Sequence, residues 1–205
     1  MLWVIVAIGA VIGALTLATA HREFIRHWWW LAAVVGSVTA FAGARAEAGA
    51  GTALVIVVAG LLMVQTPMDL RTRQLSRWAT VIAVALVSAV IAVDAVVDVV
   101  GDGAGHSVVR TGVVAVGVAA VVVAVYALLH RLSPRSLGWG DVLLVVPLGL
   151  ALGYVAADRV AFWQLLASST GAIHALVLRR MRGASGIPFG PHLLVAAWLV
   201  LLVSV

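Results

Sequence analysis

The chain has 205 residues, of which 64% are hydrophobic and 10% are charged, and its mean hydropathy is +1.17. This composition is far from that of a soluble domain and predicts a polytopic membrane protein. The formal net charge is +5, and the basic residues are spread through short gaps between apolar runs, which argues against nucleic-acid binding. The absence of cysteine excludes disulfides, thiolate metal sites and a cysteine nucleophile.

Eight apolar stretches are long enough, or nearly so, to cross a bilayer as helices, each of which needs about 20 residues. The first ends in Ala18-Thr19-Ala20, which could pass for the cleavage site of a signal peptide. Because no basic segment precedes this stretch and it is long enough to span a bilayer, we expect it to be retained as a helix. The predicted fold is therefore all-α, a single polytopic membrane domain over residues 1–205 with about eight transmembrane helices. In chain order the stretches are Met1 to Ala20, Trp28 to Ala44, Ala48 to Met68, Ala79 to Val100, Thr111 to Leu129, Val142 to Ala157, Val160 to Leu178 and Ile187 to Val205.

The distribution of arginine predicts the orientation, since Lys and Arg in short loops dominate it while acidic residues contribute little. All thirteen basic residues are arginines, and ten of them lie in the first, third, fifth and seventh gaps. The other gaps hold only Arg45, Arg110 and Arg159. The odd gaps are therefore predicted to face the cytoplasm, with both termini outside.

Two aspartates fall on the predicted cytoplasmic side, where Asp69 ends the third span and Asp141 begins the sixth. Each alone has a simpler explanation: Asp141 as the N-cap of its helix, and Asp69 as an interfacial residue beside arginines. As a pair at similar depth, the carboxylates would share a proton once brought together, and their pKa values would separate. The ionised carboxylate could then take a proton from water while the protonated one hydrogen-bonds to a scissile carbonyl.

Glycines before Asp141 favour a site for substrate at this point. Because Gly138 and Gly140 lack Cβ, another backbone can approach closely beside the aspartate. Two further glycines, Gly149 and Gly153, lie inside the sixth span and are interpreted as helix-packing residues that allow close approach.

The sequence gives less support to a metal site or to a serine nucleophile. His130, His174 and His192 are predicted in the cytoplasmic half, but their spacing matches no zinc motif, so no metal site is predicted. A serine nucleophile at Ser168 or Ser169 is also disfavoured, because neither lies in a recognisable nucleophile setting.

Four stretches carry a resemblance to a known family. Gly138-Trp139-Gly140-Asp141 is similar to the Gly-x-Gly-Asp signature of intramembrane aspartyl proteases. "PMDLRTRQLSRW", residues 67–78, resembles the segment that holds the first catalytic aspartate of type IV prepilin peptidases. "LLASSTGAIHAL" (165–176) and "IPFGPHLLVAAWL" (187–199) resemble the last two helices of that family. The resemblance spans about residues 48–205, which we expect to form the peptidase core.

The resemblance implies an intramembrane aspartyl endopeptidase in which Asp69 and Asp141 are the catalytic pair and Gly138 and Gly140 shape the approach of substrate. It implies that the protein cleaves pilin-like precursors after a short basic leader and just before an apolar helix. No metal or other cofactor is expected. Which aspartate acts as base and which as acid stays open, because protonation belongs to the coupled pair.

The resemblance also implies a location and a set of partners. We expect a multi-pass protein of the inner (cytoplasmic) membrane, with the active site facing the cytoplasm, the precursor and the lipid bilayer as partners, and no nucleic acid; the oligomeric state is not indicated. Many bifunctional members of the family carry a cysteine-rich insertion between the first two helices, associated with methylating the new amino terminus. This chain has "HREFIRH" (21–27) there, which predicts a peptidase without methyltransferase activity.

Two positions depart from the family's pattern. Leu143 stands where members commonly have a Lys two residues after the second aspartate, and Ser76 stands where they favour a Pro. Neither change removes a carboxylate, but the missing Lys removes a nearby charge that could help to tune the pair. The alternative is therefore a non-enzymatic membrane protein, either a catalytically degenerate member acting as an assembly factor or a small transporter.

Overall fold

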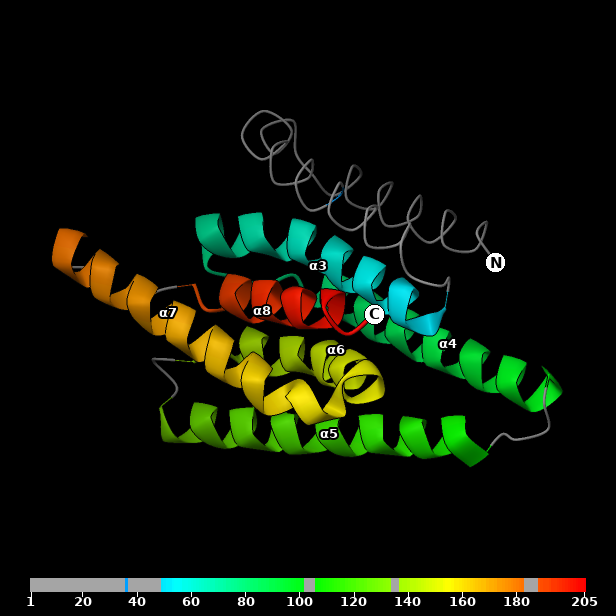
Figure 1. The fold of residues 1–205 in the computed structure, drawn as a ribbon. Coiled ribbons are helices and arrows are strands. Elements are labelled where there is room, and N and C mark those ends of the chain that lie inside the picture. Colours follow the sequence, from blue (N-terminus) through cyan, green and yellow to red (C-terminus); the bar gives the residue numbers. More distant parts are fainter. Residues whose placement is uncertain (1–35, 37–48, 102–105, 134–136, 183–187) are drawn as a thin grey trace.

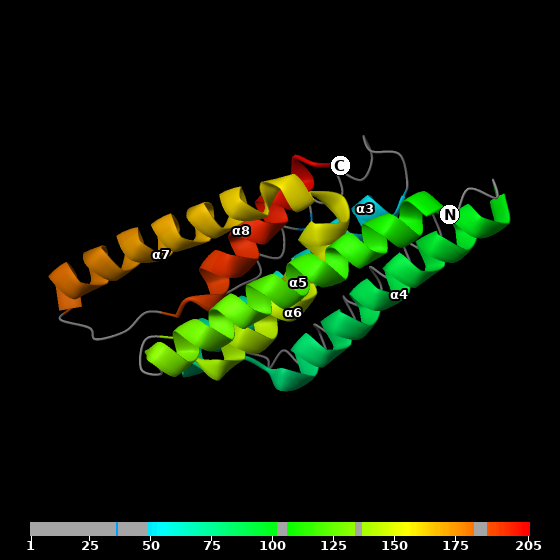
Figure 2. The same cartoon turned by 90° about the horizontal axis from the view of Figure 1, so that it is seen from below.

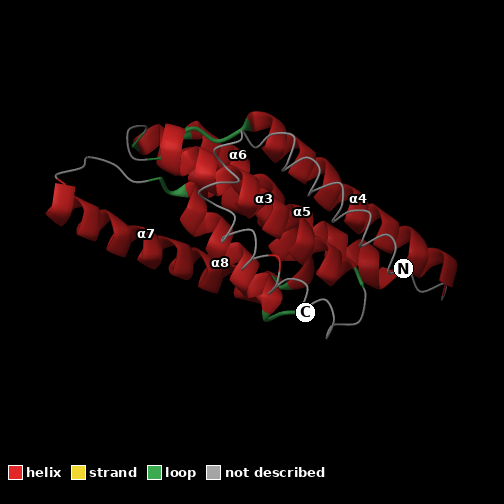
Figure 3. Cartoon of the chain, turned by 90° about the horizontal axis from the view of Figure 1, so that it is seen from above, coloured by secondary structure: helices red, strands yellow, loops and turns green. Residues whose placement is uncertain are grey.

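The computed structural model describes residues 36, 49–101, 106–133, 137–182 and 188–205. All regular secondary structure within these ranges is helical, as Figure 3 shows, and the predicted all-α fold is confirmed for this part of the chain. The elements are α3 (Ala50–Thr72), α4 (Arg77–Gly101), α5 (His106–Leu132), α6 (Trp139–Val155), the short 3-10 helix η1 (Ala157–Arg159), α7 (Val160–Arg182) and α8 (Gly190–Leu202).

Six of the predicted spans correspond to α3 to α8, whereas the first two, Met1 to Ala20 and Trp28 to Ala44, lie outside the described residues. Four helical segments of the described chain are long and apolar enough to cross a membrane, while α6 and α8 are shorter apolar helices. A total of about eight spans and the external position of both termini therefore remain predictions. The four segments are Ala50–Thr72, Arg77–Val100, Val109–Leu132 and Ala157–Arg180.

The helices divide into an inner and an outer set. The apolar part of α3 is 72% buried, whereas the corresponding parts of α4, α5 and α7 are 17%, 22% and 17% buried. Figures 1 and 2 show α8 alongside α3, with α6 and α7 also against it. The outer helices expose large apolar side chains, among them Val93, Val116 and Leu165. Such faces are stable against lipid rather than water, as expected of a membrane protein.

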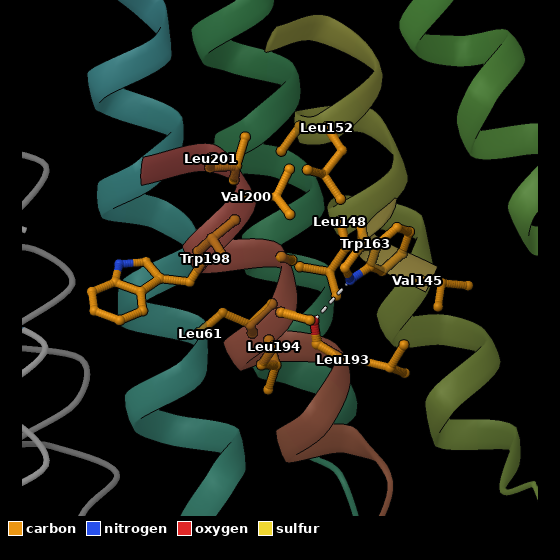
Figure 4. Packing of buried hydrophobic residues seen from close by; sticks show 14 of the residues in the cluster. Leu61, Val145, Leu148, Leu152, Trp163, Leu193, Leu194, Trp198, Val200 and Leu201 are labelled. Carbon is orange, nitrogen blue, oxygen red and sulfur yellow. Dashed lines mark hydrogen bonds between the residues drawn. The ribbon is translucent and has the colours of Figure 1, made fainter. Parts of the chain in front are cut away.

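Trp163 of α7 fixes the position of α8. Its ring is fully buried and lies beside Leu148 of α6, in the same apolar cluster as Leu193 of α8 (Figure 4). A buried indole N–H needs a hydrogen-bond acceptor, and Trp163 Nε1 donates to the Leu193 carbonyl oxygen at 3.0 Å. Leu193 lies in the first turns of α8, so this contact holds the end of α8 that begins at Gly190.

Close packing of α5 against α6 confirms the interpretation of Gly149 and Gly153. A Cβ atom on Gly149 would lie 2.9 Å from Ala119 Cα, and one on Gly153 would lie 2.8 Å from Ala115 Cα. Real Cβ atoms do not approach other carbons so closely, so only glycine allows the two backbones this separation. The helix that carries Asp141 is thereby held against α5.

The end of α3 differs from the prediction. The apolar run of the third span was predicted to reach Met68, with Asp69 marking its end, but the helix continues to Thr72. Arg73 then adopts a left-handed conformation with φ of 54°, and its N–H donates to the Asp69 carbonyl oxygen at 2.9 Å. This is a common way to terminate a helix, although a residue other than glycine is unusual there. Asp69 therefore lies within the last turn of α3 and is buried.

Candidate active site

The ends of α3 and α6 meet at a cavity of about 400 Å³. The structure brings all four residues expected at the site, Asp69, Asp141, Gly138 and Gly140, to the wall of this cavity. The remaining residues that line it are Arg73, Gln74, Leu75, Arg77, Trp139 and Leu143.

Asp69 is held by the first residue of α8. The residue is 5% exposed, and Oδ2 of its carboxylate accepts a hydrogen bond from the Gly190 N–H at 3.1 Å. The first N–H groups of a helix have no partner within the helix and carry a partial positive charge, so they suit a carboxylate. Gly190 is a site residue that sequence reasoning missed. The signal was present in Gly190-Pro191, a pair typical of a helix start, but nothing in the sequence linked it to Asp69.

Asp141 lies in the first turn of α6, at the third position of the helix and not at the predicted N-cap. The N-cap is Gly138, whose extended backbone (φ −72°, ψ 150°) leads into the helix. Asp141 Oδ2 accepts the Gly138 N–H at 3.1 Å, so the carboxylate turns back over the helix start. Its backbone N–H in turn donates to the Gly138 carbonyl oxygen at 3.1 Å. The side chain is 8% exposed and faces the cavity.

The two carboxyl groups interact electrostatically. Asp141 lies in the first turn of α6, before the predicted sixth span begins at Val142 and outside the four candidate spans, and burial together with the nearby Asp69 carboxylate raises its pKa to about 6. The hydrogen bond from Gly138 acts in the opposite direction but is the weaker influence. A carboxyl group with this pKa changes its protonation state close to neutral pH. The site therefore holds one titratable acid in the range that proton-transfer chemistry requires.

The raised pKa of Asp141 predicts a dependence of stability on pH. When the chain unfolds, this pKa returns to its usual value of about 4, so the folded state binds the proton more tightly. The contribution to stability is complete below about pH 4 and is lost as the pH rises through about 6. We expect Asp141→Asn to raise the free energy of unfolding by about 3 kcal/mol at about pH 8 and by much less at about pH 4. Thermal unfolding in detergent at both pH values measures the difference; an equal effect at both would contradict it.

A buried glutamine fixes the loop between α3 and α4. Gln65 is fully buried, and its side-chain amide pairs with the backbone of Ser76 in both directions. Gln65 Oε1 accepts the Ser76 N–H at 2.7 Å, and Nε2 donates to the Ser76 carbonyl oxygen at 2.9 Å and to Thr80 Oγ1 at 3.0 Å. All the hydrogen-bonding groups of the amide are thereby used. Sequence reasoning missed Gln65, although a polar residue inside an apolar helix and one turn before Asp69 was a usable signal.

We call the hydrogen bonds between the Gln65 side chain and the backbone of Ser76 the Gln65 clasp. The clasp uses the Ser76 N–H, which the proline favoured by the resembled family would lack, so a proline at this position should destabilise the fold. Ser76→Pro removes the N–H that Gln65 Oε1 accepts and leaves a buried acceptor without a donor. We expect it to lower the free energy of unfolding by about 1 to 3 kcal/mol. Ser76→Ala is the matched control, because it keeps the N–H and loses only the contact of Ser76 Oγ with the Ala79 N–H. A proline variant as stable as the alanine variant would disprove the importance of the clasp.

The histidines do not converge on the cavity as a metal site. His174 Nδ1 and His192 Nε2 share a hydrogen bond at 2.9 Å between α7 and α8. His130 Nδ1 instead donates to the Leu137 carbonyl oxygen at 2.8 Å, next to Gly138. Among the described residues, no group of three or more histidine or acidic side chains could hold a metal ion.

The fold and the cavity together define a class of protein: a helical membrane protein whose helix ends bring two buried carboxyl groups into one pocket. The chain is similar to proteins named prepilin leader peptidase/N-methyltransferase. It is 35% identical over 68 residues to that of Aeromonas salmonicida (strain A449) and, over the same length, to that of Aeromonas hydrophila. Each match covers 33% of this chain and 23% of the relative.

The similarity is partial, since the match spans about a quarter of the length of these curated relatives. No protein-family model matches the chain. No solved structure matches it. The comparisons thus support a distant relationship to prepilin leader peptidases and leave the activity of this chain to be argued from its site.

Proposed function

We propose that the chain is an intramembrane aspartyl endopeptidase that removes the leader of pilin-like precursors. The observation that carries the proposal is that Asp69 and Asp141, 72 positions apart on two different helices, line one small cavity with both side chains buried. Burying two carboxyl groups together is costly, and a purely structural role would not require it. The partial similarity to prepilin leader peptidases supports the same proposal.

In the proposed reaction, one carboxyl group is ionised and the other protonated. The ionised group removes a proton from water, the resulting hydroxide attacks the scissile carbonyl, and the protonated group donates a hydrogen bond to the carbonyl oxygen as charge develops there. The proton taken from water is later delivered to the leaving amine, so the enzyme returns to its starting state. The N–H groups of Gly138 and Gly190 hold the two carboxylates in position throughout.

In this proposal an arginine supplies the positive charge that the missing lysine would have placed near the carboxyl pair. Leu143 stands where the resembled family commonly has Lys, so no cation follows Asp141. Arg73 and Arg77 line the same cavity, and Arg73 is close enough to Asp69 to interact with it electrostatically. A guanidinium beside the pair favours the state in which one carboxyl group is ionised. The loss of lysine therefore does not leave the pair without a neighbouring positive charge.

The substrate follows from the resemblance and from the surroundings of the cavity. We propose a precursor whose apolar helix lies in the bilayer and whose leader reaches the cytoplasmic face of the inner membrane, where the arginine distribution puts the site. Because arginines border the cavity, we expect the basic residues of the leader to lie beyond its rim. Neither metal nor other cofactor is needed, and no methyltransferase activity is proposed.

Co-expression tests the proposed activity. The chain and a pilin-like precursor are produced together in a bacterial host that lacks its own prepilin peptidase. We expect a shortened product whose new amino terminus, read by mass spectrometry, lies at the junction of the leader and the apolar helix. Cleavage elsewhere, or no cleavage of any of several pilin-like precursors, would contradict the proposal and favour the non-enzymatic alternative.

A further inference from the structure

We propose that Leu75 is a specificity-determining wall of the cavity, fixed in place by Gln65, and that it limits the size of the substrate side chain next to the scissile bond. The inference rests on the proposed peptidase function and adds to it a residue that selects among precursors. Its basis is the position of Leu75 between the two helix ends that present the carboxyl groups.

Leu75 occupies the space that Gly140 leaves open. A Cβ atom on Gly140 would lie 3.2 Å from Leu75 Cβ and 3.3 Å from Leu75 Cδ1. The sequence suggested that Gly140 lets substrate approach Asp141, but the structure fills that face of Gly140 with a side chain of the same chain. By contrast, a Cβ atom on Gly138 would meet Asp141 Oδ2 at 3.4 Å and, apart from its two chain neighbours, no other side chain of the described residues within 4 Å. Substrate backbone can therefore approach at Gly138 and is blocked at Gly140.

The same leucine also contacts the start of α8. A Cβ atom on Gly190 would lie 3.1 Å from Leu75 Cδ2, and Gly190 is the residue whose N–H holds Asp69. The leucine thus bridges the glycine beside one aspartate and the glycine that binds the other. A side chain of substrate that enters the cavity next to either carboxyl group meets this branched, apolar wall.

The wall is held in place because the loop that carries it is hydrogen-bonded through both peptide groups that flank Ser76. Gln65 binds the N–H and the carbonyl oxygen of Ser76, the residue directly after Leu75. Gln65 and Asp69 lie one turn apart on α3, so the clasp and the carboxylate belong to one helix and keep a constant separation. A leucine on a mobile loop would give way to a larger substrate, whereas one held by this clasp excludes it.

Precursors that differ only in the residue before the scissile bond test this inference. We would measure processing of Gly, Ala, Leu and Phe versions by wild type, Leu75→Ala, Gln65→Leu and the control Leu70→Ala, whose side chain is exposed on α3 outside the cavity. In Leu75→Ala, the rate for the Leu and Phe versions relative to the Gly version should rise about 10-fold or more, the effect expected when an apolar pocket gains room for a few methylene groups of the substrate. Gln65→Leu should shift the ratio in the same direction, and Leu70→Ala should leave it unchanged.

A ratio is the chosen measure because loss of folded protein lowers all rates together and leaves the ratio unchanged. If Gln65→Leu does not accumulate, Leu75→Val supplies a milder change, and its ratio should fall between those of wild type and Leu75→Ala. An unchanged ratio in Leu75→Ala, with wild type cleaving the Gly version, would refute the role of Leu75 and leave the proposed function standing. Failure of wild type to cleave any version would overturn both.

A second measurement needs no substrate. Because the chain contains no cysteine, a single Leu143→Cys exchange gives one thiol on the wall of the cavity. Removing the leucine wall with Leu75→Ala should raise the rate at which a bulky maleimide labels this thiol, if the wall limits access as inferred. The Leu70→Ala background should label at the parental rate. Equal rates in all three backgrounds would contradict the inference.

Discussion

Asp69→Asn and Asp141→Asn are each expected to abolish processing of a co-expressed pilin-like precursor. An amide can neither take a proton from water nor alternate between acid and base, so either change removes half of the proposed chemistry. A single acid or base contributes about 10² to 10⁴ in rate, and the loss of a coupled pair should fall at the upper end. Processing is measured by the ratio of shortened to full-length precursor after a fixed time of co-expression.

We expect processing to be lost only when an aspartate that lines the cavity is replaced, and not when an acidic residue elsewhere is replaced. Asp158→Asn is the matched control, because this residue is exposed in η1 and does not line the cavity. It should process the precursor at the wild-type rate. Asparagine still accepts the hydrogen bonds from Gly190 and Gly138, so both cavity variants should accumulate as folded protein. Processing that survives either cavity variant would exclude the aspartyl mechanism.

The sequence was sufficient to predict which segments form helices but not where each helix ends. Apolar runs predicted α3 to α8 because composition alone decides where a helix can lie in lipid. The last turn of α3 was missed because Leu70, Arg71 and Thr72 are not an apolar run; the helix continues through them and closes on the left-handed Arg73. Hydropathy does not report such a closure, since it depends on backbone geometry and on where Asp69 finds a hydrogen-bond donor.

The sequence predicted that Asp69 and Asp141 lie close together, but it did not predict the groups that position their side chains. Both aspartates lie at predicted helix ends on one face, which a count of arginines and spans could reveal. The hydrogen bond from Gly190 to Asp69 joins residues 121 positions apart, and no local pattern encodes it. Leu75 was equally hidden, because a leucine in a loop has no distinguishing signal until two glycines are seen against it.

Gly190→Ala is expected to reduce processing by up to about 10²-fold through one added methyl group. A Cβ atom on Gly190 would lie 2.8 Å from Asp69 Oδ2, closer than real Cβ atoms approach other atoms, and 3.1 Å from Leu75 Cδ2, which is a tight contact. The carboxylate must therefore turn or move by a few tenths of an ångström or more, and it lengthens its hydrogen bond to the Gly190 N–H, which is 3.1 Å. Misplacement of a reacting group by about 1 Å costs about 10² in rate.

The chain offers a matched control for this substitution in Gly117, a glycine of α5 with no atom within 4 Å of the added Cβ. Gly117→Ala should leave processing unchanged and raise the free energy of unfolding by about 0.5 to 1 kcal/mol, because alanine favours a helix interior more than glycine does. Gly190→Ala should still accumulate, since it displaces the ends of side chains and leaves the helix backbones in place. Normal processing by Gly190→Ala would mean that the reaction does not depend on the hydrogen bond from Gly190 to Asp69, and the positioning role of Gly190 would then have to be rejected.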